Sequence, residues 1–193
     1  MSAPPPHYSG RAPQVVGASG IRGGTTEKTV KSSHLVFSPS PSLFFPALAA
    51  ASREELLTTL AGALTEQGIA SHRDALVKIL LEREAVGTTA LGFGIAIPHV
   101  RSMVVESTVV AFARLPDGLG FAAPDGEPVH VVFLIAAPYG VTGALYLPLL
   151  DAFAAAIRKK SSRRRLLAVE SFDDFANLMT QFVRPKVLET LAR

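Results

Sequence analysis

The stretch from residue 83 to residue 99 concentrates the residue types that could do chemistry in this sequence. It ends in His99, which follows the apolar run Ile95–Ile97, so we expect a buried strand with the imidazole just beyond it, at a sheet edge or strand end. Pro98 fixes φ and stiffens the backbone that presents the ring. A neutral imidazole has a nucleophilic nitrogen near pH 7, because its ordinary pKa is ~6.5. On residue types alone, a structural role for His99 is favoured over a catalytic one.

Two glycines in the same stretch could bind an anion. Gly92 and Gly94 allow positive φ or close approach of a ligand, and consecutive amides there could form an anion-binding nest. The pair lacks the third glycine and following helix of a dinucleotide fingerprint, and no Gly-Lys-Ser/Thr of a phosphate-binding P-loop occurs. A nucleotide-phosphate cradle therefore stays as the weaker hypothesis for this loop.

Helix signals flank this stretch. Ser52 and Glu55 form a capping box before a leucine-rich helix that ends at Gly68, and a second helix is predicted from Ser71 to about Arg83. The residues expected to face inward are Leu56, Leu57, Leu60 and Leu64 in the first helix and Leu76, Ile79 and Leu80 in the second.

Strands and helices alternate in the second half of the chain. Strands are predicted over Thr108–Arg114 and Val129–Ala136, with turns at Pro116–Gly118 and Pro124–Gly126. A helix is predicted from about Leu145 to Lys160. Ser171 and Asp174 then cap a final amphipathic helix. This order predicts an α/β domain whose sheet is covered on both faces.

The net charge of +3 belongs to the N-terminal part of the chain. Residues 1–46 hold four basic residues and one acidic residue, which leaves the remainder neutral. Residues 1–33 are rich in Pro, Gly and Ser, so we expect a disordered extension before a domain at 34–193. The basic cluster Arg158–Arg165 is expected to be a solvated loop or helix end, with docking of an acidic partner as the alternative. Because it lacks interleaved aromatic residues, no nucleic acid is expected as a partner.

Composition excludes several classes of protein. The absence of cysteine removes thiol catalysis, disulfides and cysteinyl zinc sites, and the five histidines lack ligand spacing, so we expect no metal and no cofactor. Two uncharged windows, 32–52 and 129–150, are long enough to span a bilayer. Polar residues, prolines and glycines interrupt them, so no membrane insertion is expected. With no secretory signal, the protein is expected to be cytoplasmic.

The stretch Arg83–His99 resembles the signature of the type 2 enzyme IIA family of the bacterial phosphotransferase system, the fructose, mannitol and nitrogen-regulatory branch. That pattern is R-E-x-x-G-T/S-T-x-x-G-x-G-I-A-I/V-P-H, and nearly every fixed position is met. The resemblance extends over roughly Leu43–Phe182 and includes the opening helix and the strand at Val131–Pro138. It implies a single α/β domain with a mixed β-sheet flanked by helices on both faces.

The resemblance also implies a phosphocarrier or regulatory protein. His99 would accept a phosphoryl group from an HPr-type phosphocarrier and pass it to a IIB domain, or hold it as a regulatory state. Arg83 would bind the phosphoryl oxygens through the N–H donors of its planar guanidinium. The alternative for Arg83 is an ordinary surface ion pair with a residue four positions away at the helix end. The implied phosphate-binding loop comprises Thr88, Thr89, Gly92 and Gly94.

One position departs from the family pattern. Members usually carry a second active-site histidine at the head of an H-L-x-x-L helix, where alignment on Leu147 and Leu150 puts Tyr146. Its hydroxyl could donate to a phosphoryl oxygen but stays neutral at pH 7. A packed aromatic side chain is the alternative for Tyr146. For the whole protein, the alternative is a regulatory binding module that docks on a transporter, kinase or other enzyme without transferring phosphate.

Overall fold

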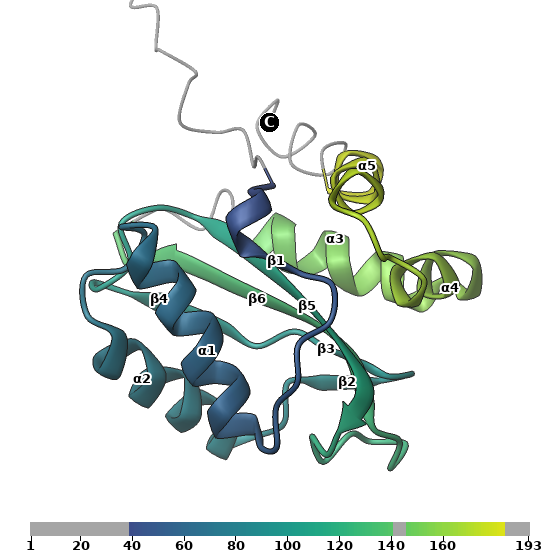
Figure 1. The fold of residues 1–193 in the computed structure, drawn as a ribbon, viewed down its shortest axis with the longest axis horizontal. Helices are drawn as coiled ribbons and strands as arrows, with labels where there is room; N and C mark the ends of the chain where they lie inside the picture. Colours follow the sequence, from purple (N-terminus) through teal and green to yellow (C-terminus); the bar gives the residue numbers. More distant parts are fainter. Residues whose placement is uncertain (1–38, 141–145, 184–193) are drawn as a thin grey trace, which may run out of the picture. The chain divides into compact units, whose positions relative to one another are not determined.

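Two long antiparallel strands, β5 (Val109–Leu119) and β6 (Val129–Pro138), form the centre of the sheet in the computed structural model (Figure 1). The model describes residues 39–140 and 146–183. The predicted extension at 1–33 and the predicted boundary at 34 lie outside these residues. Within them, β1 (Phe44–Phe45) pairs in parallel with β5 on one side.

The other edge of β6 carries the strands of the motif. Strand β3 (Ile95–Ala96) pairs in parallel with the beginning of β6, and β4 (His99–Ser102) pairs in parallel with its end. Strand β2 (Ala90–Gly92) is antiparallel to β3. The sheet is therefore mixed, as expected. His99 does not simply follow a strand but begins one, because β6 is long enough to pair with β3 and β4 in succession.

One predicted turn is wrong and the next is confirmed. Pro116–Gly118 lies inside β5, where the register against β6 shifts between Arg114 and Leu119 and Gly118 takes a φ of +72°. These residues therefore form an irregularity within the strand and not a turn. The second signal does form a turn, in which the Gly126 N–H donates to the Ala123 carbonyl oxygen (3.0 Å).

Helices α1 (Arg53–Glu66) and α2 (Arg73–Val86) cover one face of the sheet (Figure 1). The predicted capping is confirmed, because Ser52 Oγ accepts the Glu55 N–H (3.1 Å). Helix α2 begins at Arg73 and not at Ser71, because the backbone of His72 is still extended (φ −141°, ψ 103°). The Ser71 N–H donates to the Val104 carbonyl oxygen (2.9 Å). The predicted inward leucines are buried, and Ile79 is partly buried.

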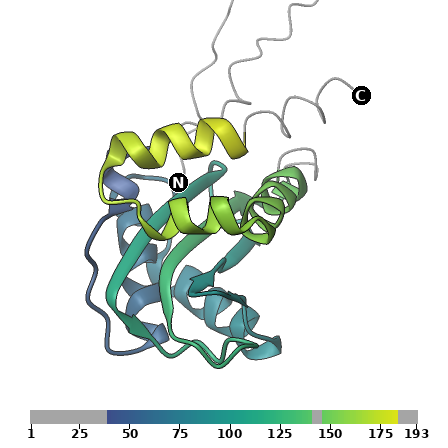
Figure 2. The ribbon, with the colours of Figure 1, turned by 90° about the vertical axis from the view of Figure 1, so that its right-hand side faces the viewer.

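The opposite face is covered by α3 (Tyr146–Arg158), α4 (Lys160–Leu167) and α5 (Phe172–Phe182), which are green to yellow in Figure 2. The basic cluster is therefore not a loop: most of it forms the separate helix α4. Ser171 caps α5 as predicted, since its Oγ accepts the Asp174 N–H (3.1 Å). A cluster of aromatic rings fills this side of the core: Phe44, Phe112, Phe133, Phe153 and Phe175.

Among residues 39–140 and 146–183, no helix combines the length and the apolar character that a bilayer span requires.

Candidate functional site

His99 is half-buried at the start of β4, opposite Ile135 of β6. Its Nδ1 lies 2.8 Å from the Ile97 carbonyl oxygen. A carbonyl oxygen only accepts hydrogen bonds, so the neutral ring must carry its proton on Nδ1 and leave the lone pair on Nε2. The backbone therefore selects the tautomer whose Nε2 is the nucleophile.

The surroundings of His99 keep its ring neutral. Burial has the largest effect and lowers the His99 pKa, and the positive charge of Arg83 lowers it further. The hydrogen bond to Ile97 and the negative charge of Glu84 raise the pKa. The net result is a pKa below 6.5. The folded protein thus binds fewer protons at His99 than the unfolded chain around this pH. The resulting stabilisation is complete above about pH 6.5 and is lost as the pH falls through the folded-state pKa.

Arg83 lies in the last turn of α2. Its Nη1 donates to the Gly87 carbonyl oxygen (2.9 Å), so the contact four residues along is a helix-end hydrogen bond and not an ion pair. This bond orients the guanidinium. Its positive charge acts on the imidazole and lowers the His99 pKa.

Tyr146 begins α3 and lies beside His99. The two ring centroids are 6.3 Å apart, with the planes tilted by 58°. Burial raises the pKa of the Tyr146 hydroxyl, against the opposing effects of the Arg101 and Arg83 charges. The structure therefore brings together the three side chains that the sequence singled out for chemistry, on α2, β4 and α3.

Sequence reasoning assigned no role to Glu84, which the structure shows to be buried and central to this region. Its side chain is 5% exposed, and its carboxylate accepts the Thr89 N–H (3.0 and 3.2 Å) and the Thr89 hydroxyl (2.6 Å). Arg53 of α1 lies 3.7 Å from the same carboxylate. The sequence signal that could have pointed to Glu84 was its place in the motif, directly after Arg83. Its burial depends on packing that one sequence does not display.

The predicted phosphate-binding role of Thr88 and Thr89 has little support from their hydrogen bonds. The Thr89 hydroxyl and N–H both bind Glu84, and the Thr88 hydroxyl donates to the Phe121 carbonyl oxygen (2.6 Å). These donors hold the loop between α2 and β2.

The Gly92–Gly94 turn binds an anion, but the anion is Asp125 of the same chain. All three turn residues have positive φ, and the Phe93 N–H donates to Asp125 Oδ2 (2.6 Å). The Gly94 carbonyl oxygen accepts the Val131 N–H (3.0 Å), whereas His99 lies opposite Ile135, which is four residues, or about 13 Å at the usual rise, further along β6. The structure does not bring this turn to His99. The carboxylate already in the turn also argues against a nucleotide-phosphate cradle.

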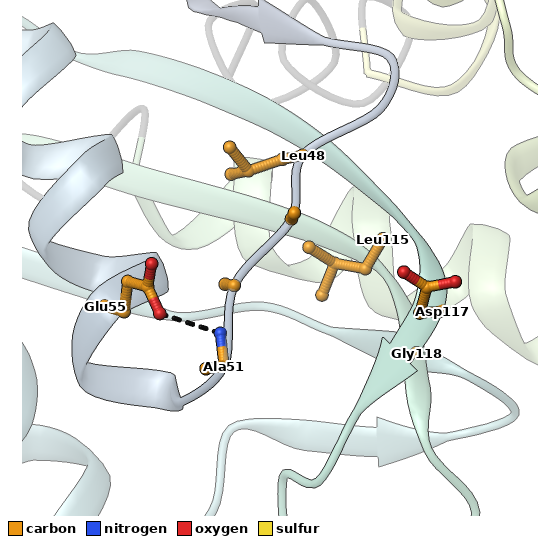
Figure 3. A pocket seen from close by; sticks show the side chains of 8 residues that line it. Leu48, Ala51, Glu55, Leu115, Asp117 and Gly118 are labelled. Atoms are coloured by element: carbon orange, nitrogen blue, oxygen red, sulfur yellow. Dashed lines mark hydrogen bonds between the residues drawn. The ribbon is translucent and has the colours of Figure 1, made fainter.

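A cavity of about 290 Å³ lies elsewhere, between the segment Leu48–Ala51 and the later part of β5 (Figure 3). Glu55 points back to the segment and accepts the Ala51 N–H (2.7 Å), with Leu115 and Asp117 on the opposite wall. None of the residues lining this cavity is a predicted site residue.

The fold and the motif geometry match a family of phosphotransferase proteins. Residues 40–182 match the family described as phosphoenolpyruvate-dependent sugar phosphotransferase system, EIIA 2. The chain belongs to this family.

Relatives of this chain include a fructose-specific component and a nitrogen regulatory protein. The chain is 34% identical to a fructose-specific EIIA component of Haloferax volcanii over 69% of this chain and 86% of that protein. It is 38% identical to a nitrogen regulatory protein of Bradyrhizobium diazoefficiens over 67% of this chain and 83% of that protein.

Solved structures show the same likeness. The nitrogen regulatory protein IIA-Ntr of Neisseria meningitidis matches with a TM-score of 0.67 at 32% identity, over 72% of this chain and 94% of that one. The mannitol IIA of Escherichia coli, solved in complex with phosphorylated IIB, has the same fold, with a TM-score of 0.63 at 24% identity over 76% of this chain and 99% of that one.

Replacing Arg83 should raise the His99 pKa. In Arg83→Gln the positive charge that disfavours imidazolium is gone, so the pKa should move up toward ~6.5, whereas in the wild type it lies below that value. Titration of the imidazole signals by NMR measures both values. Arg165→Gln, on α4, is the control and should leave the pKa unchanged. An unaltered His99 pKa in Arg83→Gln would contradict the proximity of the two side chains.

Removing Glu84 should destabilise the fold. Glu84→Ala leaves the buried Thr89 N–H and hydroxyl without partners, which should lower the free energy of unfolding by about 1–3 kcal/mol in urea titrations. Glu82→Ala, two residues earlier on an exposed face, loses a 3.9 Å pair with Lys78 and should change it by about 0.5 kcal/mol or less. Equal losses in the two variants would contradict the role of Glu84.

Proposed function

We propose that this protein is a phosphocarrier or regulatory component of a phosphotransferase system, with His99 as the residue that carries the phosphoryl group. One observation carries the proposal: the Nδ1–H bond to Ile97 leaves a neutral ring with a nucleophilic Nε2. The positive charge of Arg83 acts on the same ring. Family membership supports the reaction class, and the fructose and nitrogen-regulatory relatives support a carrier or regulatory role.

The transfer step balances without a metal or an external base. The Nε2 lone pair of His99 attacks phosphorus of a donor phosphohistidine, and the donor N–P bond breaks with its electron pair returning to the donor nitrogen. The Nδ1 proton of His99 stays on its hydrogen bond to Ile97. The product ring is positively charged and bears a dianionic phosphoryl group. Arg83 and the Tyr146 hydroxyl would then donate to the phosphoryl oxygens.

The surface around His99 suits a protein donor. Two exposed side chains adjoin the site: Tyr139, which contacts Arg101, and Leu147, which follows Tyr146, with 66 and 61% of their surface exposed. Apolar and aromatic residues around a polar centre are typical of protein interfaces. Transfer between two imidazoles requires such docking, because the reacting atoms must come within about 3–3.5 Å of each other.

The partners follow from the proposed chemistry. An HPr-type phosphocarrier would supply the phosphoryl group, and a IIB domain or a regulated target protein would receive it or respond to it. The mannitol IIA of Escherichia coli forms a complex with phosphorylated IIB, and its fold is shared here. Because phosphoenolpyruvate is made in the cytoplasm, the proposal places the protein there.

Mass spectrometry of the intact protein tests the proposal. After incubation with enzyme I, an HPr-type carrier and phosphoenolpyruvate, the wild type should gain one phosphate that is lost in acid, and His99→Ala should gain none. His130→Ala is the matched control: His130 is half-buried on β6 and its Nδ1 also lies near a carbonyl oxygen, that of Leu115 (3.1 Å), yet it should leave phosphorylation intact.

Two results would contradict the proposal. One is an unmodified wild type in a reaction that phosphorylates a known type 2 IIA protein. The other is a phosphate that persists in His99→Ala and disappears in His130→Ala.

A further inference from the structure

Arg101 shares a face of β4 with His99. Side chains alternate along a strand, and Val100 between them is buried in the core beneath α1 and α2. His99 and Arg101 therefore project to the opposite face, on the side of α3 where Tyr146 lies in the second core cluster. Strand geometry alone brings an arginine to the histidine site from a second direction.

Two tyrosine rings hold the Arg101 guanidinium. Its central carbon lies 5.6 Å from the Tyr146 ring centroid and 6.0 Å from the Tyr139 ring centroid. One of its nitrogens, Nη2, donates to the Tyr139 carbonyl oxygen (3.0 Å). Contacts of this kind orient a planar guanidinium and reduce the entropy lost when it binds an anion. Tyr146 thus contacts Arg101 and lies beside His99.

The charges of two arginines, each on a different element, act on the Tyr146 hydroxyl. Burial raises the pKa of this hydroxyl, while Arg101 of β4 and Arg83 of α2 both act to lower it. Each guanidinium is therefore close enough to the phenol to favour negative charge there. A dianionic group on His99, whose ring lies beside Tyr146, would therefore be exposed to positive charge from both side chains.

We propose that Arg101 is a second phosphoryl-binding residue, a proposal that rests on the proposed function. Together with Arg83, Arg101 supplies the positive charge around the phosphoryl group of His99. Tyr146, which the family resemblance aligns with a second histidine, positions the Arg101 guanidinium by stacking and donates its hydroxyl. The chemical consequence is a permanent charge. An imidazole at this position would titrate near pH ~6.5, whereas a guanidinium stays protonated throughout the range in which proteins fold.

The test measures the rate of His99 phosphorylation by an HPr-type carrier in matched variants. Arg101→Gln should slow the reaction roughly 10- to 100-fold, the size expected for one charge-assisted hydrogen bond, and Arg101→Lys should recover part of the loss. The control is Arg165→Gln, because Arg165 also lies 5.6 Å from an aromatic ring, that of Phe182, but on α4 and α5. It should react at the wild-type rate. Urea titration of each variant shows whether a slow one is also unfolded.

A pH profile separates a charge effect from a structural one. Adding Tyr146→His to Arg101→Gln introduces an imidazole that is charged only at acidic pH. The rate of the double variant relative to Arg101→Gln should therefore rise between pH 8 and pH 6. The same comparison is made with Arg101 present, as Tyr146→His relative to the wild type, because the new imidazole titrates there too. If Arg101 supplies charge to the phosphoryl group, the acidic rise should be larger without Arg101 than with it. A merely structural role for Arg101 gives the same rise in both.

The outcomes distinguish the two proposals. A wild type that is never phosphorylated overturns the proposed function itself. A normal rate in Arg101→Gln beside a slow Arg83→Gln overturns only the role of Arg101, as does an acidic rise of equal size with and without Arg101. Slow transfer in Arg101→Gln with recovery in Arg101→Lys and at acidic pH in the double variant supports it.

Discussion

The hydrogen bond from His99 Nδ1 to the Ile97 carbonyl oxygen is the constraint on which the proposed chemistry depends. It is the last bond of a chain that starts on α2. The Glu84 carboxylate binds the Thr89 N–H and hydroxyl, the Thr89 carbonyl oxygen accepts the Ile97 N–H (3.0 Å), and the Ile97 carbonyl oxygen accepts the His99 proton. The helix that carries Arg83 is thus linked to the imidazole through consecutive hydrogen bonds.

This chain of bonds explains why the motif spans so many residues. Its first arginine and its last histidine are the groups assigned to chemistry, and the residues between them fix the distance and the tautomer. Thr89 serves the backbone and not the ligand, because its donors are bound to Glu84 inside the protein. Pro98 between the two short strands lets β3 and β4 pair with β6 in succession, and its carbonyl oxygen accepts the Ile135 N–H (2.9 Å).

The sequence predicted the parts that depend on local pattern. The capped helices at Ser52 and Ser171, the strand at Val129 and the two-sided sheet follow from spacing and capping residues, which act within a few residues. The family resemblance pointed to His99, Arg83 and Tyr146, and the structure brings them together. Their roles in the reaction remain predictions.

The parts that local pattern missed depend on tertiary packing. A glycine turn that could bind a phosphate is occupied by Asp125, whose place in space no spacing rule gives. Arg101 drew no attention as a single exposed arginine, although the alternation of side chains after His99 could have placed it on the same face. The Pro-Asp-Gly sequence at residues 116–118 predicted a turn, but it lies inside β5 because this long strand continues to pair with β6.

The most direct test of the central claim is a measurement of the protonation and phosphorylation of the two His99 nitrogens by ¹⁵N and ³¹P NMR. The account predicts a proton on Nδ1 and a lone pair on Nε2 in the resting protein, and phosphorus bonded to Nε2 after reaction with an HPr-type carrier. A resting ring with its proton on Nε2, or a phosphoryl group on Nδ1, would contradict it.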